Sequence, residues 1–354
     1  MNKEKIYANA FNQSLQIGPV GLRKIKKYFG GFEKGWSAPF SELDRLLGRK
    51  EFEEFRQKID PGKEFEILEK ENISVILPDE FPPLLSEIEV LPQILYVKGA
   101  PPTEEDTGKI HLAVVGTRKC TSYGKEACEK IVRGLKGHDI TIVSGMALGI
   151  DTAAHKTAIE NGMRTIAILG CGLGEQVLYP PSNRKLANEI VESGGCIISE
   201  YPYDMKAALF TFPQRNRIVA GLCEGTLVVE APEKSGALIT AFLALEYNRE
   251  VFALPGGIFG VNSKGTNKLI KMGAIPVTEN TDILQSFGIN TGNSETETAL
   301  SPEEERIVSL LFEPLERDEL MRKSKLPISQ SNPLLCRMEI KGIIKEIDGK
   351  IYKL

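Results

Sequence analysis

Short apolar runs alternate with longer amphipathic segments between about residue 71 and residue 288. Continuous apolar runs predict strands buried on both faces, and the amphipathic segments predict helices between them. The expected strands are an edge element within FPPLLSEIEVLPQILYVKG and then 112–115, 141–144, 165–169, 196–199, 226–229, 251–254 and 275–277. The expected helices are about 123–136, 150–161, 184–193, 214–222, 236–248, 266–272 and 280–287. This alternation is typical of an α/β fold with an extended Rossmann-like, doubly wound parallel sheet.

The regions on either side follow different patterns. Residues 1–70 are helical in pattern and contain LQIGPVGLRKIKKYFG, in which Gly18 and Gly21 precede an amphipathic basic helix. This stretch resembles a helix-hairpin-helix or SAM-like turn, which either offers backbone N–H groups to a phosphate or only packs two helices together. After the core (71–288) and a polar, acidic linker (289–300), residues 301–354 show three helical patterns and a hairpin around Asp348 and Gly349. Three helices and a hairpin predict a winged-helix-like C-terminal domain.

Composition limits the classes of protein that this chain can represent. A length of 354 residues with 42% hydrophobic residues suits two or three globular units. The net charge of −4 means that binding to an anionic polymer must depend on a local basic patch. The six cysteines lie singly, without CxxC spacing, and no signal-peptide or membrane-spanning apolar segment is found. We therefore expect a reduced, soluble, cytoplasmic protein that is not bound to a membrane.

The turn after the first strand of the core carries cations. In a parallel sheet, ligands bind at the carboxyl ends of the strands, and a dinucleotide needs further glycines there for close approach to its pyrophosphate. The stretch GTRKCTSYG has one glycine, Gly116, followed by Thr117, Arg118 and Lys119. The turn therefore favours an anionic ligand held by side chains.

Two later segments after strands extend this candidate site. FPQRNR places Phe212, Arg215, Asn216 and Arg217 at the start of an apolar helix, which combines cations, an amide and a stacking face. That combination suits a nucleic-acid strand, and Tyr179 is a second candidate stacking face. EKSGALITA places Lys234, Ser235 and Gly236 at another helix start, which predicts either a phosphate cradle or a plain N-cap.

An enzymatic interpretation has less support from the residues. Ser144, Asp151 and His155 could form a catalytic triad, but the turn lacks the G-x-S-x-G elbow, so we expect Asp151 to cap its helix and His155 to pack inside. The chain contains no G-x-x-x-x-G-K-[ST] motif, no HExxH motif and no paired metal-ligand spacing. We expect no catalytic residue, no metal and no cofactor.

The motifs of the core resemble those of the DprA (Smf) family of bacterial DNA-processing proteins. They run in the family's order from about residue 75 to 285, as VVGTRKCTSYG, SGMALGIDTAAH, LGCGLGEQVLYPPSN, SEYP, FPQRNRIVAGL, VVEAPEKSGALITA, REVFALPGG and GTNKLIKMGA. The resemblance implies a non-enzymatic protein that binds single-stranded DNA and forms a homodimer. It also implies loading of the RecA recombinase onto DNA covered by single-strand-binding protein, in natural transformation.

The resemblance also implies roles for individual residues. Arg118 matches the arginine of the family's DNA pocket, Arg215 and Arg217 would contact phosphates, and Asn216 would fix their geometry. The pairs Ser144-Gly145 and Ser235-Gly236 would receive backbone oxygens. One departure is Pro181, where family members often carry lysine, so Arg184 or Lys185 would have to replace that contact. The full set of predicted DNA-binding residues is Arg118, Lys119, Ser144, Gly145, Asn183, Arg184, Phe212, Arg215, Asn216, Arg217, Lys234, Ser235 and Gly236.

Two alternatives stay open at this point. LPGG also occurs in Rossmann-like nucleotide phosphoribohydrolases, although PGGIFGVNSKGTNKLI lacks the catalytic glutamate expected there. The winged-helix-like end could instead read duplex DNA. Its presumed recognition helix, however, offers only Arg337 and Lys341 as cations, which favours contact with protein.

Overall fold

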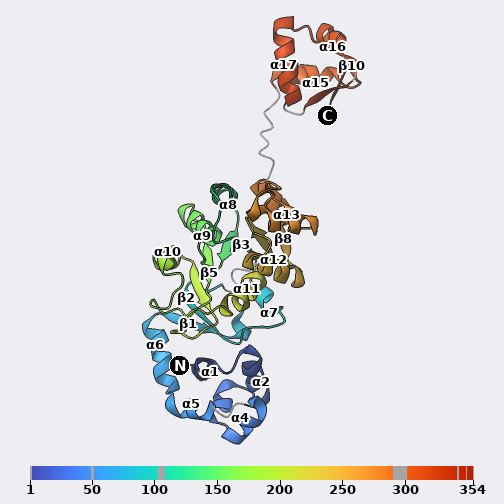
Figure 1. Ribbon diagram of the computed structural model, residues 1–354. Coiled ribbons are helices and arrows are strands. Elements are labelled where there is room, and N and C mark those ends of the chain that lie inside the picture. Colours follow the sequence, from blue (N-terminus) through green and yellow to red (C-terminus); the bar gives the residue numbers. More distant parts are fainter. Residues whose placement is uncertain are drawn as a thin grey trace. The chain divides into compact units, whose positions relative to one another are not determined.

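The computed structural model describes residues 2–48, 52–102, 108–289, 301–340, 343–347 and 349–353. The chain forms two compact units, Met1–Phe287 and Gly288–Leu354, which are described separately (Figure 1). Most of the predicted linker 289–300 lies outside the described residues. Within the described segments, no helix is both long enough and apolar enough to cross a membrane.

A nine-stranded sheet forms the centre of the first unit. Its strand order is β1-β2-β6-β5-β4-β3-β7-β8-β9, and the strands from β6 to β9 are parallel. The first two strands are antiparallel and form one edge, so the predicted edge segment supplies β2, one strand in from β1. The strands are β1 (Ile73–Ile76), β2 (Leu95–Gly99), β3 (Ile110–Val115), β4 (Ile140–Ser144), β5 (Thr165–Ile168), β6 (Cys196–Ser199), β7 (Gly225–Val228), β8 (Glu250–Ala253) and β9 (Ile275–Pro276). The predicted α/β class and parallel sheet are confirmed.

Helices cover both faces of this sheet (Figure 1). Alternate residues of one strand enter different apolar clusters: Ile166 and Ile168 pack in one, and Ala167 in the other. Because side chains alternate across a strand, these are the two faces of the sheet, as a doubly wound fold requires. The covering helices are α7 (Pro83–Ser86), α8 (Ser122–Gly134), α9 (Ile150–Glu160), α10 (Arg184–Glu192), α11 (Thr211–Gly221), α12 (Gly236–Glu246), α13 (Lys264–Lys271) and α14 (Asn280–Ser286). Short 3-10 helices are η1 (Pro78–Glu80), η3 (Pro181–Asn183) and η4 (Val261–Ser263).

The N-terminal helices pack on this sheet within the same unit. They are α1 (Lys3–Gln13), α2 (Pro19–Phe29), α3 (Phe32–Ser37), α4 (Phe40–Leu47), α5 (Phe52–Lys58) and α6 (Pro61–Lys70). Their apolar side chains share a cluster with β1, β2 and β5, and Asn12 donates to the carbonyl of Glu200 at 2.9 Å. A Cβ on Gly21 would lie 2.8 Å from Cγ2 of Ile17, so this glycine leaves room for the Ile17 side chain of the turn that precedes α2. The predicted boundary near residue 70 coincides with the end of α6, but the helices do not form a separate unit.

The second unit has the predicted winged-helix arrangement. It contains α15 (Pro302–Leu310), β10 (Leu315–Glu316), α16 (Arg317–Ser324), α17 (Ile328–Ile340), β11 (Ile344–Ile347) and β12 (Lys350–Lys353). The strand order is β10-β12-β11, antiparallel throughout, so the predicted hairpin is present. Its Gly349 has a φ of 76°, a conformation that glycine adopts readily, while Asp348 and Lys341 lie outside the described residues. Arg337 is exposed on α17.

Candidate nucleic-acid interface

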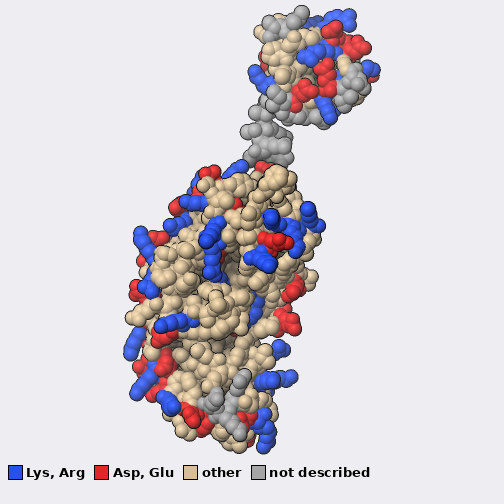
Figure 2. Space-filling model, viewed as in Figure 1, with Lys and Arg blue, Asp and Glu red and all other residues tan. Residues whose placement is uncertain are grey.

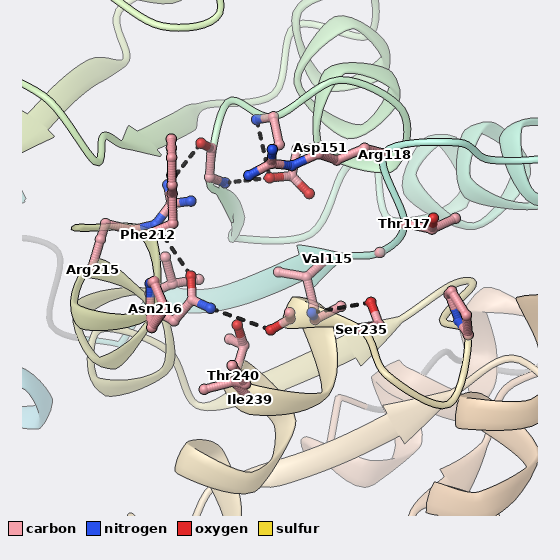
Figure 3. Close-up of a pocket in the computed structure, with 18 of the residues that line it drawn as sticks. Val115, Thr117, Arg118, Asp151, Phe212, Arg215, Asn216, Ser235, Ile239 and Thr240 are labelled. Atoms are coloured by element: carbon pink, nitrogen blue, oxygen red, sulfur yellow. Dashed lines mark hydrogen bonds between the residues drawn. The ribbon is translucent and has the colours of Figure 1, made fainter. Parts of the chain in front are cut away.

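A cavity of about 480 Å3 opens at the carboxyl ends of β3, β4 and β7. The strand order reverses here: from β3 the chain proceeds to β4 on one side and, later, to β7 on the other. Such a reversal separates the loops above neighbouring strands and creates the crevice in which α/β proteins bind ligands. Its walls come from the turn after β3, the loop after β4, the start of α11 and the start of α12 (Figure 3).

Three exposed cations, Arg118, Lys119 and Lys234, line the rim of this cavity. None of them takes part in an ion pair within the described part of the chain. The guanidinium carbon of Arg118 lies 5.0 Å from the centre of the Phe212 ring, and the Tyr179 ring lies 5.8 Å from that of Phe212. Figure 2 shows Lys and Arg side chains beside a hollow on this face of the unit. The rim thus joins accessible positive charge to aromatic faces.

Comparisons with known proteins show the family to which the chain belongs. Residues 72–288 match the family model for DNA recombination-mediator protein A, and residues 293–350 match the DprA winged helix domain. The chain belongs to the DprA/Smf family. It is 33% identical to Protein Smf of Synechocystis sp. over 99% of both chains. It is also 44% identical to DNA processing protein DprA of Streptococcus pneumoniae, over 60% of this chain and 73% of that protein.

Solved structures of DprA proteins share the fold. The X-ray structure of DprA from Streptococcus pneumoniae matches with a TM-score of 0.67 and 35% identity, covering 80% of this chain and 98% of that one. DNA processing protein A from Helicobacter pylori matches with a TM-score of 0.54 and 30% identity, over 61% of this chain and 95% of that one. That second structure was described for its single-stranded DNA binding mode.

Arg215 lies in the cavity wall, where it is only 5% exposed. Its Nη1 donates to the carbonyl of Gly145 at 2.7 Å and to that of Ile168. A Cβ on Gly145 would lie 2.5 Å from this guanidinium, so any larger residue there would displace it. Burial lowers the pKa of Arg215, and the neighbouring Asp151 carboxylate opposes that shift. The buried guanidinium therefore holds the loop after β4 in place.

The carboxylate of Asp151 completes this frame. One oxygen accepts the backbone N–H groups of Gly145 and Ala147, each at 3.2 Å. The N-cap of α9 is Gly149, and no side chain caps this helix. The prediction that Asp151 caps its own helix is therefore wrong, because its side chain binds the preceding loop instead. Burial raises the pKa of Asp151, whereas Arg215 and the two backbone N–H groups lower it. The N–H of Gly145, expected to receive a DNA oxygen, is already used.

The buried polar residues behind the cavity do not form a catalytic triad. Ser144 is fully buried, and its hydroxyl donates to the carbonyl of Val114 at 2.6 Å. Nδ1 of His155 lies 2.7 Å from Oγ1 of Thr165, and burial lowers the pKa of His155 to about 3. Both side chains therefore act in packing, as expected for His155.

Arg217 lies away from the cavity in a buried ion pair. Its Nη2 contacts both carboxylate oxygens of Glu200, at 2.6 and 2.7 Å, and both side chains are buried. Burial raises the pKa of Glu200, and Arg217 opposes that shift. The structure thus separates the two arginines of FPQRNR from the rim and gives both of them internal partners.

The start of α12 forms the opposite wall. Ser235 is the N-cap and accepts the N–H of Ala237 at 3.3 Å, as its plain capping role predicts. Gly236 is exposed and has open space where a Cβ would stand, so a ligand can approach its backbone. Asn216 donates to the carbonyl of Gly236 at 3.3 Å and accepts from Nε of Arg215 at the same distance, which ties α11 to α12.

Two predicted residues support the site from outside the cavity. Asn183 is buried and donates to the carbonyl of Met146 and to Oγ1 of Thr152, both at 2.9 Å. Arg184 donates to the carbonyl of Gln176 at 2.9 Å, and Lys185 pairs with Glu189, so neither replaces the lysine lost at Pro181 within the cavity.

Asn262 is a lining residue that sequence reasoning missed. It donates to the carbonyl of Lys119 at 3.0 Å and so joins the loop after β8 to the first turn. The glycine-rich stretch before it marks the loop but gives no reason to select this asparagine.

Proposed function

We propose that this chain binds single-stranded DNA in the cavity at the switch point and acts there as a recombination mediator. The observation that carries the proposal is the rim itself, at the site that α/β folds use for ligands. Its three cations have no ion-pair partner among the described residues, and one of them, Arg118, lies over the Phe212 ring. Membership of the DprA/Smf family, and the single-stranded DNA binding mode described for the relative from Helicobacter pylori, support it.

The chemistry of the rim favours a single strand over a duplex. Arg118, Lys119 and Lys234 can neutralise phosphates without reading sequence. Phe212 and Tyr179 offer ring faces, and unpaired bases can stack on such faces whatever their identity. Bases inside a duplex are already stacked and paired, so they cannot turn toward these rings.

The proposed role is binding without turnover. Among the residues that the structure describes, Asp151 is the only carboxylate that lines the cavity, and the two backbone N–H groups from which it accepts hold it in the wall. A nucleotide phosphoribohydrolase needs an available carboxylate, so no observation favours that alternative. We further propose that the protein works as a cytoplasmic homodimer and loads RecA onto strands covered by single-strand-binding protein during natural transformation.

Two measurements test this proposal. Fluorescence anisotropy should give tighter binding to a single-stranded oligonucleotide than to a blunt duplex of equal length, with little dependence on sequence. Equal affinity for both at several salt concentrations would contradict a dedicated single-strand site.

The second measurement follows RecA assembly on DNA coated with single-strand-binding protein. The full-length protein should shorten the lag before assembly, and a folded variant that cannot bind DNA should not. Release of free base from a nucleoside monophosphate, dependent on this chain, would instead support the hydrolase.

A further inference from the structure

A second hollow, of about 500 Å3, adjoins the cavity of the rim. Phe212 lines both, and a small hollow of about 30 Å3 between them is lined by Arg118, Tyr179 and the same Phe212. The two larger hollows are therefore neighbours on one surface, separated by the Tyr179 and Phe212 rings. We call the second one the outer hollow.

The outer hollow has different chemistry from the rim. Its walls are the loops after β5 and β6, and they include Val177, Leu178, Leu209 and two alanines. Among the described residues that line it, Lys206 is the one with a charged side chain. Leu209 is 92% exposed. Its apolar side chain therefore lies in water, and covering it with an apolar group would be favourable. The outer hollow thus suits a flat apolar group that carries at most one nearby negative charge.

Backbone hydrogen bonds hold the two loops together. The N–H of Gly172 donates to the carbonyl of Met205 at 2.8 Å, and that of Gly174 donates to the carbonyl of Tyr203 at 3.0 Å. Thr211 at the start of α11 donates to the carbonyl of Gly170 at 2.6 Å. These contacts tie the loop after β5 to the loop after β6, so hydrogen bonds of the chain itself hold the walls of the outer hollow.

We infer that the outer hollow is a binding subsite for a nucleobase of the same DNA strand whose phosphates the rim cations hold. The inference rests on the proposed single-strand binding and adds that phosphates and bases of the strand are bound at different places. A strand that crosses the Phe212 ring leaves the cationic rim and enters an apolar site with Lys206 at its edge. An apolar side chain of a partner protein would also fit the walls, but continuity with the rim through Phe212 and Tyr179 favours the base.

Two strands of equal charge test the subsite. One is an oligothymidylate, and the other is an abasic strand of the same length, with the same phosphates and no bases. Stacking of one base on protein side chains changes affinity between about five-fold and a hundred-fold. The wild-type protein should therefore bind the intact strand at least about five-fold more tightly than the abasic strand. Equal affinity of the wild-type protein for both strands would overturn the inference while leaving phosphate binding intact.

The variant Leu209→Ser removes the apolar wall without changing charge. It should weaken binding of the intact strand by about five-fold and leave the abasic strand unaffected. Leu245→Ser, at an exposed leucine of α12 that lines none of these hollows, is the matched control and should change neither. Arg118→Ala should weaken both strands.

Other results for Leu209→Ser would overturn the inference. Unchanged affinity for the intact strand, or equal loss on both strands, means that the outer hollow holds no base. If the variant keeps its DNA affinity but no longer assists RecA, the outer hollow is a protein-docking site. Failure of wild-type protein to bind either strand would instead refute the proposed function.

Discussion

The rim and the wall of the same cavity use positive charge in opposite ways. At the rim, Arg118, Lys119 and Lys234 are exposed and have no ion-pair partner among the described residues. In the wall and behind it, Arg215 and Arg217 are buried, and each is bound to groups of the chain itself. Proximity to a cavity therefore does not by itself make a cation a ligand contact, because a buried guanidinium that is bound to groups of the chain has fewer N–H donors to offer.

This difference assigns separate tasks to the two groups. The arginines of the wall stabilise the fold and hold the loop after β4 in shape, whereas the cations of the rim provide affinity for an anionic strand. A substitution in the wall should therefore change unfolding, and one at the rim should change binding.

The largest effect should come from Arg217→Ala. Removing one partner of a buried ion pair leaves the other charge without compensation, which costs about 3–5 kcal/mol of the free energy of unfolding. The carboxylate of Glu200 would be left in that state. Urea unfolding followed by fluorescence of Trp36, the single tryptophan, measures the loss. A change below about 0.5 kcal/mol would show that the pair is not a structural element.

A double substitution at the rim, Arg118→Ala with Lys234→Ala, should act on binding alone. Hydrogen bonds to charged groups contribute about 1.5–3 kcal/mol each, so affinity for a single strand should fall by at least about 100-fold. Stability should change by no more than about 0.5 kcal/mol, because exposed side chains make few internal contacts.

The matched control for the rim is Arg133→Ala with Lys156→Ala. Both residues are exposed on the same unit, and neither lines the cavity. This variant has the same net charge as the rim variant and should retain DNA binding. Equal loss of affinity in the two would mean that overall charge, and not the rim, attracts DNA.

The buried side chain of His155 should also make the stability of the protein sensitive to acid. The pKa of His155 is about 3 in the folded protein, against an ordinary value of 6.5. The unfolded chain therefore binds the extra proton between these values, so stability falls as pH drops below about 6.5 and the loss is complete near pH 3. At pH 5 this amounts to about 2 kcal/mol.

Comparison with His155→Gln isolates this contribution. Between pH 7 and pH 5 the variant should lose less unfolding free energy than the wild type, whatever its stability at pH 7. If the free energy of unfolding changes equally with pH in the two proteins, the pKa of His155 is not lowered in the folded state.

The sequence predicted the sheet better than the site, for a physical reason. The run at 226–229 became β7 (Gly225–Val228), because a continuous apolar stretch can be satisfied only inside a covered sheet. The role of Arg217 depends on Glu200, which follows a different strand, and that of Arg215 depends on the carbonyl of Gly145, 70 residues away. Such pairings are set by tertiary packing. The place of Arg118 at the cavity could be predicted, because its turn directly follows a strand and depends on no distant partner, whereas its role in binding stays a prediction.

The smallest effect, and the one that counts the cations directly, is the salt dependence of binding. Each phosphate contact on a single strand contributes about −0.7 to the slope of log K against log salt. The four cations that follow strands in the sequence, Arg118, Arg215, Arg217 and Lys234, would give about −3. The three rim cations of the structure give about −2 for one subunit, and Arg118→Ala should reduce that to about −1.4. Titrations of a short oligonucleotide, which reaches only one subunit, distinguish these values. A slope near −3 that falls only to about −2 in Arg118→Ala would mean that buried arginines turn outward to meet DNA, and the separation of wall from rim would then hold only for the free protein.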